Sequence, residues 1–130
     1  MTGWMLFAVT AAAGGLGAGL RYIVDVAVMR GRRGAFPLGI LIVNVTGALA
    51  LGIVTGLGSA IGGDVATIIG VGALGGYTTF STVSGETVLL GRRGRRDWAW
   101  ANLIGTLVAA VLAAGLGLTL GRLVAGWLPS

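Results

Sequence analysis

The chain has 130 residues, enough for one domain, and 55% of them are hydrophobic while only 10% are charged. Because soluble domains carry about 25% charged residues, this composition indicates an integral membrane protein. There is no cysteine or histidine, and all nine basic residues are arginine, which excludes disulfides, thiolate or imidazole metal sites and lysine Schiff-base chemistry. The four acids are too scattered for a paired-carboxylate or hard-metal site: Asp25, Asp64, Glu86 and Asp97.

With these groups missing, we expect that the protein is not an enzyme. The net charge of +5 does not indicate nucleic-acid binding, because most arginines stand in two clusters beside apolar runs, as is usual at the cytoplasmic face of a membrane. Residues 1–20 lack a basic start, and their apolar run continues past any plausible cleavage site. We therefore expect no removable signal peptide.

Four apolar runs are long enough to cross a bilayer, whose core of about 30 Å requires about 20 helical residues. In chain order, they predict transmembrane helices at about 4–29, 37–57, 65–90 and 98–128. The connections are too short to hold another domain. Residues 1–130 are therefore expected to form one all-α, multi-pass domain of four transmembrane helices in the cell membrane.

Tryptophans and glycines support this arrangement. Four tryptophans stand near the ends of the runs, where indole rings anchor helices at the headgroup level: Trp4, Trp98, Trp100 and Trp127. Small residues recur at four-residue spacing, which is typical of closely packed membrane helices. These stripes are Gly15 and Gly19, Gly52 and Gly56, Gly72 and Gly76, and the row Gly105, Ala109, Ala113, Gly117 and Gly121.

Polar side chains within the runs must face protein, water or a permeating species, because lipid cannot satisfy them. In the first run, Arg21 precedes Asp25 by one helical turn, close enough for an ion pair. The pair is either a neutralised couple near a membrane face or an arginine that attracts anions into a vestibule. In the second run, Asn44 either bridges helices or donates its amide to an anion.

The third run is interrupted by two glycines and four Ser or Thr residues within 75–82, which favours a helix break near the middle of the membrane. Broken helices at this depth often form ion sites. Free carbonyls would suit a hard cation, whereas hydroxyls and the positive edge of the Phe80 ring would suit an anion. In the fourth run, Asn102 and Thr106 lie on one face, four residues apart.

Three motifs together resemble the CrcB/Fluc family of fluoride channels. They are Gly14-Gly15-Leu16-Gly17-Ala18 with Arg21-Tyr22, then Pro37-x-Gly39 with Val43-Asn44 and Gly47, and then Gly75-Gly76-Tyr77-Thr78-Thr79-Phe80-Ser81-Thr82. They follow one another in the family's order and spacing, and the resemblance covers nearly the whole chain.

The resemblance implies a passive fluoride-selective channel built as an antiparallel dimer, with a central structural sodium ion. By position, the carbonyls of Gly75 and Thr78 would bind sodium, and Arg21 would stand at a vestibule. The fluoride pathway would include Asn44 and Phe80, together with the polar residues Thr79, Ser81, Thr82, Asn102 and Thr106.

The chain departs from the family's pattern along the implied pathway. Val83 stands where a second Phe is common, Ile40 replaces a Thr, and Asn102 and Thr106 replace a Tyr and a Ser. Seven arginines follow the first and third runs and therefore share one side of the membrane: Arg30, Arg32, Arg33, Arg92, Arg93, Arg95 and Arg96. This bias predicts both termini outside. We expect an oppositely oriented paralogue as the partner.

Two other interpretations remain open from the sequence. A non-conducting subunit that supports a conducting paralogue would explain the altered pathway positions. A small multidrug transporter is also a four-helix antiparallel dimer, but it needs a membrane-embedded carboxylate, and the first run offers only Asp25 beside Arg21.

Overall fold

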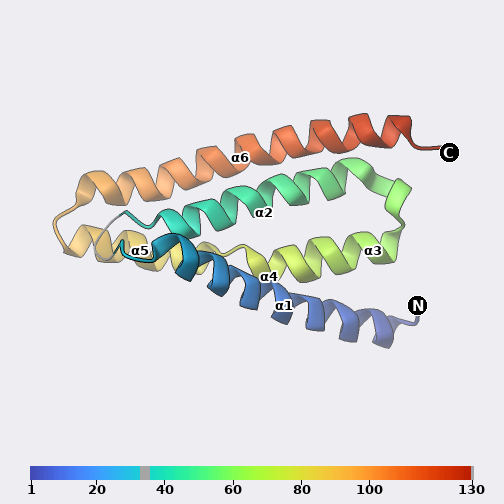
Figure 1. Ribbon diagram of the computed structural model, residues 1–130, viewed down its shortest axis with the longest axis horizontal. Coiled ribbons are helices and arrows are strands. Elements are labelled where there is room, and N and C mark those ends of the chain that lie inside the picture. The colour runs from blue at the N-terminus through green and yellow to red at the C-terminus, as the bar shows by residue number, and fades with distance from the viewer. Residues whose placement is uncertain (33–35, 130) are drawn as a thin grey trace.

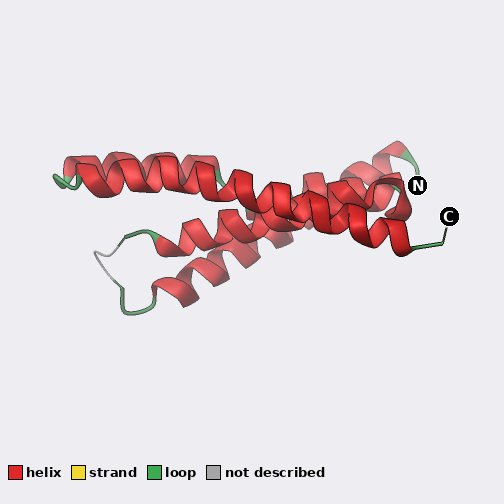
Figure 2. Ribbon diagram, turned by 90° about the horizontal axis from the view of Figure 1, so that it is seen from above, coloured by secondary structure: helices red, strands yellow, loops and turns green. Residues whose placement is uncertain are grey.

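The computed structural model describes residues 1–32 and 36–129, so Arg33 of the first arginine cluster lies outside the described residues. Within this part of the chain the structure contains helices and loops and no strand (Figure 2). The elements are α1 (Gly3–Met29), α2 (Leu38–Leu57), the 3₁₀ turn η1 (Gly58–Ile61), α3 (Gly63–Thr67), the π-helical η2 (Ile68–Leu74), α4 (Gly75–Tyr77), α5 (Phe80–Arg92) and α6 (Arg96–Trp127).

Three helices in the described residues, α1, α2 and α6, are long and apolar enough to cross a membrane. They contain 27, 20 and 32 residues. At about 1.5 Å per residue, even the shortest spans about 30 Å, the thickness of the hydrocarbon core. These helices occupy the runs expected at 4–29, 37–57 and 98–128, and they support the prediction of a membrane protein.

The remaining run, expected at 65–90 as a transmembrane helix with a break, is divided into two parts. Helical structure from α3 through η2 to α4 stops at Tyr77, and α5 begins at Phe80. Between them, Thr78 has a ψ of 155° and Thr79 a φ of −153°, both extended. The break expected within 75–82 therefore lies at Thr78 and Thr79.

The elements form an elongated bundle (Figure 1). Helices α2 and α6 run side by side and make the most extensive contact in the chain. The row of α3, α4 and α5 lies along α2, and α1 packs against η2 and α4. Both termini lie at the same end as the connection that contains η1, whereas residues 30–32, residues 36–37 and the 93–95 turn lie at the opposite end (Figure 1).

Glycines permit the close approach of α2 and α6. A Cβ at Gly52 would overlap the Ala114 carbonyl, and a Cβ at Gly117 would overlap the Leu49 carbonyl. Gly56 and Gly121 make similar close contacts, and these four glycines form the seam between α2 and α6. The predicted packing role of these stripes is confirmed, since an added methyl group would meet backbone atoms that cannot move away.

The stripe expected at Gly15 and Gly19 in α1 is wrong for contacts within this chain, because a Cβ at either would meet nothing within 4 Å. Gly14 and Gly17 face the neighbouring segment instead: Gly14 approaches Gly76, and a Cβ at Gly17 would overlap the Ala73 carbonyl. Gly105 likewise has open space around it. The spacing identified a glycine-rich helix but not the face it turns toward its neighbour.

This seam predicts different effects for two glycines on the same helix. Gly117→Ala is expected to destabilise the protein by about 1–3 kcal/mol, because the new methyl overlaps the backbone of α2. Gly115→Ala, where a Cβ meets nothing within 4 Å, should be neutral or stabilising by up to about 1 kcal/mol. Thermal unfolding in detergent would compare them, and equal melting temperatures would contradict the seam.

Candidate functional site

The Asn44 side chain clamps the helix break. Its Nδ2 donates to the Thr79 carbonyl oxygen at 3.0 Å, and its Oδ1 accepts from the Thr79 backbone N–H at 2.8 Å. Asn44 comes from the middle of α2 and is buried. The amide therefore satisfies both backbone groups of a residue that cannot bond within a helix, which is how a break becomes tolerable in a membrane.

Asn44 thus has the helix-bridging role that the sequence left as one alternative. The other alternative also keeps a physical basis, because an amide nitrogen carries two N–H donors and Thr79 accepts only one of them. Gly47, one turn further along α2, permits this approach, since a Cβ there would overlap the Thr78 methyl group.

Thr79 also caps α5. Its Oγ1 accepts from the Thr82 backbone N–H at 3.2 Å and donates to Thr82 Oγ1 at 3.2 Å. Threonine is a favoured N-cap because its hydroxyl satisfies an otherwise unpaired N–H of the first turn. Ser81, in the same turn, is exposed.

The clamp and the cap leave two carbonyls without their usual donors. In a continuous helix, the N–H of Thr79 would bond to the Gly75 carbonyl and that of Thr82 to the Thr78 carbonyl. Here those N–H groups donate to Asn44 Oδ1 and Thr79 Oγ1. Gly75 and Thr78 are the two residues expected to offer carbonyls to sodium.

A groove of about 540 Å³ runs beside the break. Its polar lining includes Asn44, Thr78, Thr79 and Thr106, and its apolar lining includes Phe80, Val83, Leu103 and Leu107. Phe80, the first residue of α5, is 74% exposed. The groove therefore gathers polar groups from α2, the break and α6 beside an accessible phenyl ring.

Thr106 differs from most threonines in this bundle. Six others donate their hydroxyl to the carbonyl four residues earlier: Thr46, Thr55, Thr67, Thr78, Thr87 and Thr119. The Thr106 hydroxyl is buried and has no partner within the described part of the chain. Thr106 is also one of the residues that line the groove, so an unpaired donor lies close to the groove wall.

Asn102 holds α5 and α6 together and does not line this groove. Its side chain is completely buried, and Nδ2 donates to Thr87 Oγ1 at 3.0 Å and to the Val83 carbonyl at 3.3 Å. Its Oδ1 has no partner in the described residues. The two polar residues of α6 therefore share a buried face, but only Thr106 reaches the groove.

Arg21 stands apart from the groove residues, on α1. The ion pair expected between Arg21 and Asp25 is wrong: among the described residues, the ion pairs are Met1 with Asp64 and Arg95 with Asp97. Asp25 Oδ1 instead lies against Gly39 of α2. One-turn spacing permitted the pair, but the Asp25 side chain turns toward the neighbouring helix.

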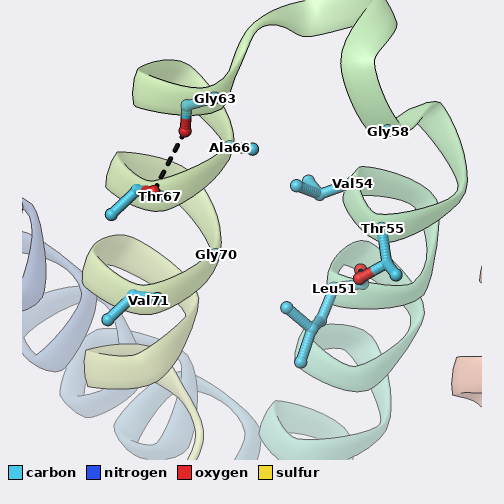
Figure 3. Close-up of a pocket in the computed structure, with 9 residues that line it drawn as sticks. All are labelled: Leu51, Val54, Thr55, Gly58, Gly63, Ala66, Thr67, Gly70 and Val71. Atoms are coloured by element: carbon cyan, nitrogen blue, oxygen red, sulfur yellow. Dashed lines mark hydrogen bonds between the residues drawn. The ribbon is translucent and has the colours of Figure 1, made fainter.

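A second hollow, of about 620 Å³, lies between α2 and the α3–η2 segment (Figure 3). Leu51 and Val54 point into it from α2, and Ala66 points into it from the other side (Figure 3); Thr55 and Val71 also line it. Both threonine hydroxyls on its wall, Thr55 and Thr67, are already bonded to carbonyls. The hollow shares Leu51 with the groove at the break.

Membrane-crossing helices around a polar break define a class, the membrane channels and transporters, in which irregular backbone at membrane depth lines an ion or substrate site. The chain belongs to the CrcB family: residues 8–118 match the family described as CrcB-like protein, Camphor Resistance (CrcB). The resemblance inferred from the three motifs is thereby confirmed.

Similar proteins share most of the chain. It is 45% identical over 126 residues to "Fluoride-specific ion channel FluC 1" of Leifsonia xyli, covering 95% of this chain and 90% of the relative. It is 41% identical over 130 residues to FluC 1 of Frankia casuarinae, with 95% and 98% covered. FluC 2 of Mycobacterium tuberculosis is 44% identical over 104 residues, with 80% and 81% covered.

Proposed function

We propose that this chain is a subunit of a passive, fluoride-selective ion channel that lowers cytoplasmic fluoride. The observation that carries the proposal is the groove that brings together Asn44, the exposed Phe80 ring and Thr106, whose buried hydroxyl has no partner in the described residues. An anion that leaves water needs donors in place of its hydration shell. Relatives named as fluoride-specific channels support fluoride as that anion.

The donors in this groove suit a small anion. Thr106 contributes an O–H and Asn44 a second N–H, and the edge of Phe80 carries the positive part of the ring quadrupole. None of these groups is a full charge, so an ion would be held weakly enough to leave. Thr79, Ser81 and Thr82 belong to this pathway in the proposal as the polar turn that positions Phe80.

In the proposed channel, the broken row from Gly63 to Arg92 is the fourth membrane crossing. The row extends along α2 between the two ends of the bundle (Figure 1), which is compatible with a crossing. Its halves, α3–α4 and α5, are individually too short to span, but together they cover the same length as their neighbours.

Sodium is proposed as a structural ion at the break. Backbone carbonyls suit a hard cation, and the diverted N–H groups of Thr79 and Thr82 leave the Gly75 and Thr78 oxygens available. Two carbonyls are a small ligand set. A second chain packed break to break would supply two more, so this proposal is linked to a dimer.

The proposed partner is an oppositely oriented paralogue. The hollow of about 620 Å³ beside α2 offers space for a neighbouring chain to fill, separate from the groove of the proposed pathway. Relatives numbered FluC 1 and FluC 2 are compatible with paralogues within one organism. Arg21, which no carboxylate neutralises in the described residues, is proposed to face a vestibule.

A non-conducting supporting role remains the second candidate, and one observation favours it. Val83 lines the groove with an aliphatic side chain that offers neither a donor nor an aromatic edge. A heterodimer could keep one competent pathway while the pathway containing Val83 is closed.

Fluoride flux from liposomes tests the main proposal. The chain, reconstituted with its partner, is expected to release a fluoride gradient electrogenically while a matched chloride gradient is retained. A fluoride electrode and a chloride electrode measure the two rates. Equal rates for the two anions would refute selectivity.

Thr106→Val tests the donor that carries the proposal. Valine keeps the shape but removes the hydroxyl, so flux should fall about 10- to 100-fold, as expected for a lost hydrogen bond to a charged species worth about 1.5–3 kcal/mol. Thr119→Val is the matched control, because that exposed hydroxyl is bonded to Gly115. Equal flux in both variants would exclude Thr106 from the pathway.

A further inference from the structure

The end of the bundle opposite the termini carries a concentration of exposed positive charge. Arg92, Arg93, Arg95 and Arg96 are displayed by the turn between α5 and α6, and the same end carries Arg30 and Arg32. Among the described residues at this end, one ion pair is formed, between Asp97 and Arg95. The other described arginines of this cluster therefore face solvent or headgroups without a protein counter-ion.

The turn that displays these arginines is well defined. Three backbone hydrogen bonds define it. The N–H of Arg93 donates to the Leu89 carbonyl oxygen at 3.0 Å, that of Gly94 to the Gly91 carbonyl oxygen at 3.2 Å, and that of Arg95 to the Leu90 carbonyl oxygen at 2.9 Å. Gly94 has a φ of 78°, which only glycine adopts at little cost. Hydrogen bonds thus hold the backbone of the turn, and its four arginines are exposed.

Arg95 differs from the other arginines because its side chain contacts Asp97 and Trp98. Its Nε and Nη2 each donate to a different carboxylate oxygen of Asp97 at 3.2 Å, and its guanidinium stacks 3.6 Å over the Trp98 ring. Trp98 in turn meets Phe36 edge to face, with centroids 5.9 Å apart. Phe36 precedes α2, so this stack joins the two arginine-bearing connections at the level of an aromatic anchor.

We propose that this arginine end is a binding site for the headgroup of an anionic phospholipid. The phosphodiester would be held by Arg92, Arg93 and Arg96, while the Trp98–Phe36 stack marks the depth at which headgroups meet acyl chains. A lipid is favoured over a soluble anion because these arginines adjoin membrane-crossing helices, where lipid phosphates are concentrated and apolar contact adds to the charge.

The test compares lipid binding to the purified chain in neutral detergent by native mass spectrometry. Phosphatidylglycerol is expected to bind more tightly than phosphatidylcholine, and this preference should fall as salt rises. An Arg92→Gln, Arg93→Gln, Arg96→Gln variant should lose on the order of 100-fold in phosphatidylglycerol affinity, about fivefold for each arginine. Arg122→Gln, which removes an exposed arginine at the other end, should bind like the parent chain.

Three results would overturn the proposal. They are equal binding of the two lipids, equal losses in the triple variant and Arg122→Gln, and displacement of phosphatidylglycerol by an equal concentration of inorganic phosphate. The last would identify an anion site in place of a lipid site. Since the altered side chains are exposed, unchanged melting temperatures are expected, and the variants report on binding and not on folding.

Discussion

Asn44→Asp is expected to reduce fluoride flux about a thousandfold. A carboxylate in this position places a negative charge on the groove that the anion must follow. Two unit charges 4 Å apart at an effective dielectric constant near 20 repel by about 4 kcal/mol, and each 1.4 kcal/mol is about tenfold in rate. The same change removes the N–H that donates to the Thr79 carbonyl.

The two effects are separated by Asn44→Leu, which removes both hydrogen bonds to Thr79 without adding charge. It should lower the melting temperature, because the N–H and carbonyl of Thr79 are left buried and unpaired at a cost of about 1–3 kcal/mol each. Flux is measured only in preparations that elute as a homogeneous assembly. Full flux through a well-folded Asn44→Asp channel would remove Asn44 from the pathway.

Sequence reasoning located the helices because length and hydropathy are local properties. Helices α1, α2 and α6 coincide with long apolar runs, and the family assignment followed from motifs at fixed spacing. The position of the break was also readable, since consecutive glycine and hydroxyl residues weaken a helix locally. In the structure, the N–H groups of Thr79 and Thr82 donate to side-chain oxygens and not to helix carbonyls, and the helix is interrupted there.

Helix rotation and side-chain choice were not readable in the same way. Gly15 and Gly17 are both in a glycine-rich stretch of α1, yet only Gly17 is pressed against a neighbouring backbone. Similarly, Asp25 could reach Arg21 along its own helix but lies against Gly39 of another helix. These outcomes depend on how α1 is turned in the bundle, which spacing along one helix does not specify.

The role of Asn44 shows the same limit at the candidate site. The sequence identified an isolated amide in an apolar helix as important, but its partner is a backbone 35 residues away. Thr106 likewise shares its face with Asn102, although Thr106 lines the groove with an unpaired hydroxyl and Asn102 links α6 to α5 through hydrogen bonds. The π-helical η2 carried no recognised signal in the sequence.

The remaining large effect concerns orientation in the membrane. Both described arginine-bearing connections lie at one end of the bundle and both termini at the other (Figure 1). Arginine bias sets the orientation of membrane proteins, with the positive side retained in the cytoplasm. A C-terminal reporter should therefore show one orientation, with the terminus outside. Neutralising Arg92, Arg93, Arg95 and Arg96 with glutamine should produce a mixed population.

A single orientation has a consequence for assembly. Antiparallel pairing of two identical chains would require half of them to carry both arginine clusters across the membrane, at about 2.5–3.5 kcal/mol for each charge placed at the bilayer centre. The chain expressed alone should consequently give little fluoride resistance, and co-expression with an oppositely biased paralogue should restore it. Equal populations of both orientations, together with fluoride conduction by the chain alone, would show that it forms a homodimer and that the arginine bias does not select its partner.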